Sequence, residues 1–163
     1  MEGDLPSDFY RKKSEIRVRV NLTLLAMSFT LFTFISALNA QMLRDNIFLA
    51  LQLTLAIPLI ISSIFARSKL TYIKRTKKWS DYGFYTFIMA YTFLINSVGI
   101  ILSYVISFKI ALVFFLLNIA GALTYSTIDL SEHKDKLKKR LKKDWIFIVG
   151  IILLGILPSA LAT

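Results

Sequence analysis

Long uncharged segments alternate with charged ones along this chain of 163 residues. The uncharged runs cover 20–43, 46–66, 82–108, 110–128 and 145–163. Each run is close to or longer than the roughly 20 residues that an α-helix needs to cross the hydrocarbon core of a bilayer. Membrane barrels use alternating segments of about 10 residues, a pattern that these continuous Leu, Ile and Phe runs contradict. The sequence therefore predicts an all-α, polytopic transmembrane helix bundle with five spans.

We expect a single membrane domain over residues 1–163. Its spans are predicted at about 20–40, 47–66, 84–107, 110–128 and 145–163. Short turns join the first span to the second and the third to the fourth, so each pair forms a hairpin. The fifth run is shorter and contains Gly150, Gly155 and Pro158. A re-entrant or interfacial segment therefore remains an alternative for this run.

Positive charge lies at every second junction between the predicted spans. Eighteen of the twenty Lys and Arg residues fall in three blocks, with five in 1–19, six in 67–82 and seven in 129–144. Because cytoplasmic loops retain Lys and Arg, we expect a cytoplasmic N-terminal segment 1–19 and basic cytoplasmic loops 67–82 and 129–144. Five spans then place the C-terminus outside. The basic start followed by a long apolar run predicts a signal anchor in a multi-pass protein of the plasma (cytoplasmic) membrane.

Composition agrees with a membrane protein and changes the interpretation of the net charge. Hydrophobic residues make up 56% of the chain, more than the ~45–50% of a typical soluble domain. The net charge of +10 is then explained by the cytoplasmic loops and their attraction to anionic lipid. We therefore expect membrane lipid, and not nucleic acid, as the partner of the basic residues.

The second basic loop, 129–144, has a helical pattern of its own. It contains no Gly or Pro, and its leucines recur on one side of a helix. Five basic residues gather near its end and form the predicted contact for anionic lipid headgroups or a protein partner: Lys138, Lys139, Arg140, Lys142 and Lys143.

Neutral polar and small residues form stripes within the spans. At helical spacing, Thr92, Asn96, Gly99 and Ser103 share one face of the third span. Asn118 and Tyr125 lie on one face of the fourth span together with Gly121, and Gln52 begins a weaker stripe on the second. Because Asn96 and Asn118 are equally far from the turn between their spans, they lie at the same depth. A mutual hydrogen bond between them would satisfy two amides that lipid cannot.

These stripes have two interpretations that the sequence leaves open. Small and amide residues allow helices to approach closely and to bond, so the stripes can be interhelical contacts. Alternatively, hydroxyl and amide groups can line a neutral path for an ion or a small solute. Both interpretations place the same residues inside the bundle.

Residues suited to catalysis or metal binding are scarce. The chain has no Cys and a single His, His133, which lies among lysines. No G-x-S-x-G, P-loop or H-E-x-x-H motif occurs. Ionisable residues are absent from the middle of the spans, which disfavours a proton-driven transporter. We therefore expect no enzymatic activity, no catalytic residue, no metal and no cofactor.

Two hypotheses for function follow. The first is a channel or passive transport component with a neutral path lined by Ser, Thr and Asn. The alternative is a non-enzymatic accessory or assembly subunit of a membrane complex, whose basic cytoplasmic face binds anionic lipid or a partner. In both cases we expect a homo-oligomer or a subunit of a larger complex, because association buries more of the polar stripes.

Overall fold

The computed structural model describes residues 7–72, 77–132 and 137–161, and it describes side-chain surroundings for 11–72, 77–128 and 144–161. Within these ranges the chain is helical apart from short breaks at Asn39, Asn46 and Ile106–Ser107, and no strand forms. The elements are α1 (Ser7–Leu38), α2 (Ala40–Asp45), α3 (Ile47–Tyr72), α4 (Lys77–Val105), α5 (Phe108–Glu132), α6 (Leu137–Ile151), the π-helix η2 (Ile152–Ile156) and α7 (Leu157–Leu161). The predicted all-α class is confirmed for the part of the chain that is described.

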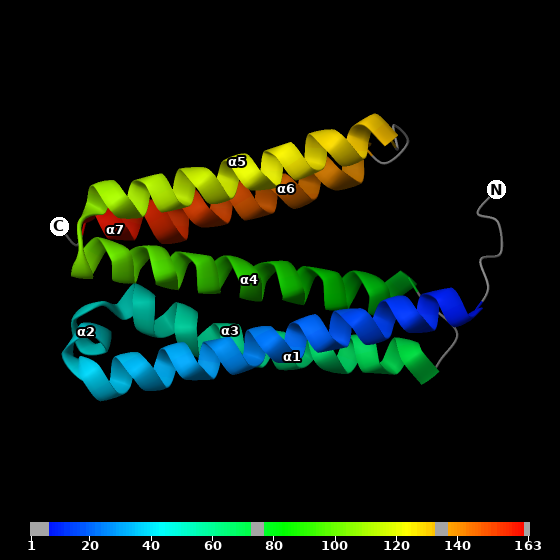
Figure 1. Ribbon diagram of the computed structural model, residues 1–163, viewed down its shortest axis with the longest axis horizontal. Helices are drawn as coiled ribbons and strands as arrows, with labels where there is room; N and C mark the ends of the chain where they lie inside the picture. Colours follow the sequence, from blue (N-terminus) through cyan, green and yellow to red (C-terminus); the bar gives the residue numbers. More distant parts are fainter. Residues whose placement is uncertain (1–6, 73–76, 133–136, 162–163) are drawn as a thin grey trace. The chain divides into compact units, whose positions relative to one another are not determined.

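Five helical segments among the described residues are long and apolar enough to cross a membrane. They are Arg11–Leu38, Ile47–Tyr72, Lys77–Val105, Phe108–Ile128 and Asp144–Leu161. The last segment runs through α6, η2 and α7 without interruption (Figure 1). Its length meets the requirement for a span, as expected of a multi-pass membrane protein.

The helices extend beyond the predicted spans where the sequence turns basic. α3 continues to Tyr72, and α4 already begins at Lys77, so the described parts of the predicted loop 67–82 are mostly helical. Lys, Arg and Leu are good helix formers, and 67–72 contains neither Gly nor Pro. The change to charged residues therefore marks the end of the apolar run without ending the helix.

Side-chain caps begin the helices that follow three of the turns. The Met42 amide donates to Asn39 Oδ1 at 3.2 Å, and the Leu49 amide donates to Asn46 Oδ1 at 3.0 Å. Ser107 Oγ accepts from the Ile110 amide at 3.4 Å. Asn and Ser are preferred N-caps because their side-chain oxygens bind amides that the first turn of a helix leaves unpaired.

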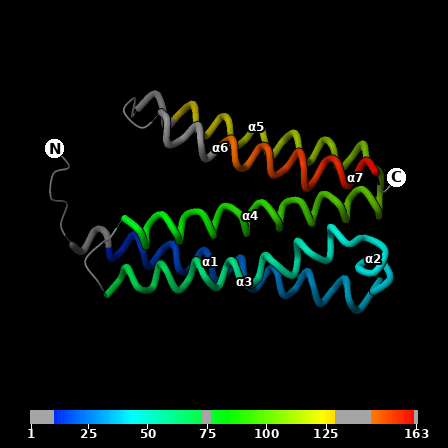
Figure 2. Tube along the Cα trace, turned by 180° about the vertical axis from the view of Figure 1, so that it is seen from behind, coloured from blue at the N-terminus to red at the C-terminus, as the bar shows by residue number. Residues whose placement is uncertain are grey.

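The chain divides into two compact units, which are described separately. The first contains residues 1–43 and 53–91, and the second contains 44–52 and 92–163. The long helices α3 and α4 each contribute to both units. In the first unit, α1 runs alongside α3, as both Figure 1 and Figure 2 show. In the second unit, α5 lies beside α6 and α7.

Hydrogen bonds between buried polar side chains join the helices of the first unit. Asn21 Nδ2 of α1 donates to Ser63 Oγ of α3 at 2.8 Å, and the Ser63 hydroxyl donates to the Gly83 carbonyl of α4 at 2.8 Å. One hydroxyl therefore connects three helices. Nearby, Ser14 Oγ donates to the Arg67 carbonyl at 2.7 Å. These bonds satisfy polar groups that an apolar environment cannot.

Small residues permit the close approach of α3 and α4 in this unit. Ala66 is fully buried, and a Cβ added at Gly83 would lie 2.9 Å from the Ala66 Cβ. Ala56 and Ser63 share the face of α3 that carries Ala66, and all three are buried. Small side chains at a helix interface are typical of membrane bundles.

The Ser63→Ala variant tests the hydrogen bonds that join the three helices. We expect it to lower the free energy of unfolding by about 1–2 kcal/mol, because the buried Asn21 amide loses its acceptor and the Gly83 carbonyl loses its donor. Reversible unfolding in mixed micelles measures the change. Thr30→Ala is the matched control, since Thr30 is exposed and its hydroxyl donates to the Ala26 carbonyl of its own helix. Equal stabilities of the two variants would contradict the expectation.

Candidate functional site

The predicted stripe on the third span is buried in the second unit. Thr92, Asn96 and Ser103 of α4 are 3%, 0% and 5% exposed, and Gly99 is also buried. The structure thus brings all four residues of this stripe to one covered face. Asn96 and Ser103 of this stripe donate to backbone carbonyls of the fifth span, whereas the sequence predicted Asn118 of the fourth span as the partner of Asn96.

Asn96 does not form the predicted hydrogen bond with Asn118. Asn96 Nδ2 donates to the Gly150 carbonyl of α6 at 3.1 Å, whereas Asn118 Nδ2 donates to the Phe114 carbonyl of its own helix at 2.8 Å. The prediction was wrong because equal distance from a turn determines depth and leaves the rotation of each helix undetermined. Gly150 has no side chain to cover its carbonyl, so the Asn96 amide reaches the backbone of the fifth span.

Glycines and one phenylalanine determine how the helices of the second unit fit together. Phe115 of α5 is fully buried, and its ring occupies the space that a Cβ on Gly99 would need. A Cβ on Gly155 would lie 2.7 Å from the same ring and 2.5 Å from Asn96 Oδ1. Two glycines on different helices therefore form a notch for Phe115. The sequence pattern marked Gly150, Gly155 and Pro158 as residues that could interrupt the fifth span, and it did not single out Phe115.

A proline alters the backbone hydrogen bonds of the fifth span. Pro158 has no N–H, so the Leu154 carbonyl four residues earlier lacks its usual donor. Gln52 Nε2 donates to this carbonyl at 2.7 Å. The helix widens around this point into η2, where the Leu157 amide donates to the Ile152 carbonyl five residues back. Gln52, predicted as a stripe residue, thus compensates for the proline.

A similar contact lies near the end of the same span. Ser103 Oγ donates to the Ser159 carbonyl at 3.3 Å. Ser159 lies in the last described turn of α7. The hydrogen bonds of Gln52, Asn96 and Ser103 therefore all end on the backbone of the fifth span.

Among the described side chains of the second unit, three buried oxygen atoms have no hydrogen-bond partner. They are Gln52 Oε1, Asn96 Oδ1 and Ser159 Oγ. Their residues are 4%, 0% and 0% exposed. Each can accept a hydrogen bond or coordinate a cation, so they are the chemically most distinctive groups of this unit.

The predicted face of the fourth span is turned outward. Tyr125 is 60% exposed, Asn118 is half-buried, and a Cβ on Gly121 would meet no atom within 4 Å. The buried face of α5 is instead formed by Ala111, Phe115 and Ser126. We predicted that Asn118 and Tyr125 face the inside of the bundle together with the stripe of the third span. In the structure they lie on a different face of α5 from its buried residues. The large ring of Phe115 enters the glycine notch, and this contact determines the rotation of α5.

The five basic residues predicted to contact lipid or a partner fall in α6. The backbone of α6 is helical from Leu137, whereas the side chains of Lys138, Lys139, Arg140, Lys142 and Lys143 lie outside the described residues. Among the side chains that are described, no group of three or more Asp, Glu, His or Cys residues could hold a metal ion. No protein-family model, curated protein or solved structure matches this chain.

The Gly99→Ala variant tests the glycine notch. We expect it to lower the free energy of unfolding by about 1–3 kcal/mol, because the new methyl group overlaps the Phe115 ring. Gly121→Ala is the matched control for the folding of the single chain and should be neutral or stabilising there, since its methyl group enters open space on a helix and Ala is still a small residue. Unfolding in mixed micelles measures both.

A double-mutant cycle then assigns the effect to the contact. In the Phe115→Ala background, the ring is gone, so Gly99→Ala should cost much less than it does in the original protein. Strictly additive effects of Gly99→Ala and Phe115→Ala would rule out the notch as the cause.

Proposed function

We propose that this protein is a non-enzymatic accessory or assembly subunit of a membrane complex. The observation that carries the proposal is that the polar stripe is buried and hydrogen-bonded to the backbone of the fifth span. Asn96, Gln52 and Ser103 bond to backbone carbonyls, and Phe115 fills the notch between Gly99 and Gly155. Polar groups engaged in this way hold helices together.

The outward face of α5 supports association with another transmembrane helix. Gly121 offers a place where a second backbone can approach closely, because nothing lies near its Cβ position. Asn118 and Tyr125 on either side of it add polar groups, and the neighbouring Leu117 is 67% exposed. A small residue flanked by amide and hydroxyl groups is suited to a helix of a neighbouring subunit, whether a second copy of this chain or a different protein.

The proposed orientation in the cytoplasmic membrane follows from charge. Along the sequence, the three basic blocks occupy every second junction between the spans, and the turns near Arg44 and Lys109 occupy the junctions between them, which supports a cytoplasmic N-terminus and an external C-terminus. In this arrangement the basic ends of the helices form the cytoplasmic face, where anionic lipid or a protein partner binds.

The assembly proposal predicts different effects for two neighbouring substitutions on α5. Gly121→Leu should block the approach of a second helix and reduce the mass of the purified particle, or remove a co-purifying subunit. Ala120→Leu is the matched control because Ala120 is also exposed but lies on another side of the helix. Mass measurement in native nanodiscs, with the 18.6 kDa chain as the unit, distinguishes the variants. Identical masses and identical co-purifying proteins would contradict the proposal.

The orientation can be tested cleanly because the chain contains no Cys. Single-cysteine variants at Lys12 and Lys109, both exposed, are treated in intact cells with a maleimide that cannot cross the membrane. We expect Lys109→Cys to react from outside and Lys12→Cys to react only after permeabilisation, because positive charge is retained inside. The opposite labelling pattern would reverse the proposed orientation.

A passive transport component is the second candidate, and the unpartnered oxygens favour it. Gln52 Oε1, Asn96 Oδ1 and Ser159 Oγ are buried acceptors that water or a cation could satisfy. This candidate predicts flux of ions or small solutes through liposomes containing the purified protein. Asn96→Ala should change that flux, whereas Asn118→Ala should change it less, because the Asn118 amide bonds to its own helix. Flux equal to that of empty liposomes would eliminate this candidate.

A further inference from the structure

A pocket of about 420 Å³ lies between α1 and α3 at the charged end of the first unit. Its α1 wall consists of Arg11, Glu15, Val18 and Arg19. These residues are spaced by four, three and one positions, so they share one side of the helix. The pocket thus has two guanidinium groups, one carboxylate and one apolar side chain on its first wall.

The opposite wall comes from the last turns of α3. It consists of Ser68, Thr71 and Tyr72, which again share one helical face and add three hydroxyl groups. The hydrogen bond from Ser14 Oγ to the Arg67 carbonyl joins the two helices beside the pocket. The two walls are therefore held at a defined separation by a buried contact, although their polar ends remain open.

We propose that this pocket binds the headgroup of an anionic phospholipid, with the phosphodiester on the arginines and a headgroup hydroxyl on Glu15. The inference rests on the proposed orientation, which puts this end of α1 and α3 at a membrane surface. The size of the pocket falls within the roughly 300–1,000 Å³ of small-ligand sites. Arg is suited to phosphate because its planar guanidinium donates two parallel hydrogen bonds.

The charge distribution favours a phosphodiester over a free phosphate. Arg11 Nε pairs with Glu15 Oε1 at 3.2 Å, and the two side chains are 66% and 46% exposed. An ion pair that is this exposed contributes little stability, so Arg11 can turn to an incoming phosphate at low cost. Glu15 remains in the pocket and repels a dianion, whereas it accepts a hydrogen bond from a hydroxyl. A singly charged lipid with a hydroxyl-bearing headgroup satisfies both groups.

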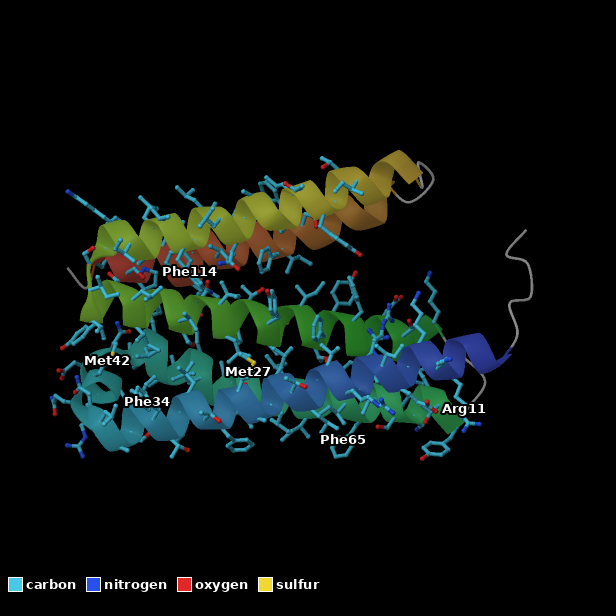
Figure 3. The ribbon with its side chains drawn as sticks, in the orientation of Figure 1. Arg11, Met27, Phe34, Met42, Phe65 and Phe114 are labelled. Atoms are coloured by element: carbon cyan, nitrogen blue, oxygen red, sulfur yellow. The ribbon has the colours of Figure 1, made fainter. Side chains whose placement is uncertain are left out.

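Exposed apolar side chains beside the pocket can contact the acyl chains of a lipid whose headgroup binds in it. Ile16 and Val20 on α1 are 56% and 47% exposed, and Phe65 on α3 is 69% exposed. Figure 3 shows Arg11 at the charged end of α1 and Phe65 projecting from the ribbon of α3. Tyr72, which is 90% exposed, belongs to the residues that gather at membrane–water interfaces. The pocket therefore lies where basic, aromatic and apolar surfaces meet.

Lipid retention by the purified full chain tests the pocket. The protein is transferred into micelles with equal amounts of phosphatidylglycerol and phosphatidylcholine, and native mass spectrometry counts the lipid molecules that remain bound. We expect the chain to retain phosphatidylglycerol in preference to phosphatidylcholine. The double variant Arg11→Gln, Arg19→Gln should weaken this preference about tenfold or more, since each basic residue near a membrane surface contributes on the order of 1 kcal/mol.

Matched variants exclude a general charge effect. Arg44→Gln removes an exposed positive charge near the other end of α1 and should leave the preference unchanged. Arg19→Lys keeps the charge and loses the two parallel donors, so it should give an intermediate preference. A phosphatidylglycerol preference that the double variant retains, or that Arg44→Gln lowers equally, would overturn the proposal.

Competition identifies the source of the phosphate. Soluble glycerol phosphate should displace the lipid poorly, because it has no acyl chains and carries a second negative charge toward Glu15. Displacement by glycerol phosphate, or by an acidic peptide, at the concentration of the lipid would overturn the assignment to a lipid. Retention in micelles does not depend on orientation or on assembly. A reversed cysteine-labelling pattern, or an unaltered particle mass for Gly121→Leu, therefore tells against the proposed function and not against the pocket.

Discussion

Satisfaction of the fifth-span backbone is the constraint on which the second unit depends. Pro158 deprives the Leu154 carbonyl of its usual donor, and no water is available in a hydrocarbon core to replace it. Gln52 supplies the donor from the start of α3. Asn96 and Ser103 of α4 bond to two further carbonyls of the same segment. Three buried, uncharged polar side chains of two helices are therefore directed to the backbone of a third.

Close packing at glycines determines the remaining geometry of this unit. Phe115 occupies the notch between Gly99 and Gly155, so α5 can adopt only a narrow range of rotations. Because packed interiors tolerate little overlap, this contact decides which side of α5 faces inward. Asn118, Gly121 and Tyr125 are turned away as a result. The packing of Phe115 against the two glycines thus also exposes the face of α5 that we propose to contact a neighbouring subunit.

The first unit relies on hydrogen bonds between small polar side chains, and it keeps its charged end accessible. Asn21, Ser63 and Gly83 connect three helices, and Ser14 joins α1 to α3 close to the arginines. The buried hydrogen bond from Ser14 to α3 and the exposed charged pocket therefore lie close together along α1. In a chain whose spans carry no Asp, Glu, Lys, Arg or His near their middle, charge can act only at the helix ends, and this pocket brings two arginines and one glutamate together at such an end.

The sequence by itself determined the number of long apolar helices and the inward face of the third span. Run length must match membrane thickness, and helical spacing places Thr92, Asn96, Gly99 and Ser103 on one side, so both follow from counting residues. Counting also predicted an equal depth for Asn96 and Asn118. Only the tertiary structure decided that Asn96 bonds to Gly150, that Gln52 compensates for Pro158, and that α5 faces inward with Phe115. Depth is set by the rise along a helix, whereas rotation and partner choice depend on which side chain fills which space on a neighbouring helix.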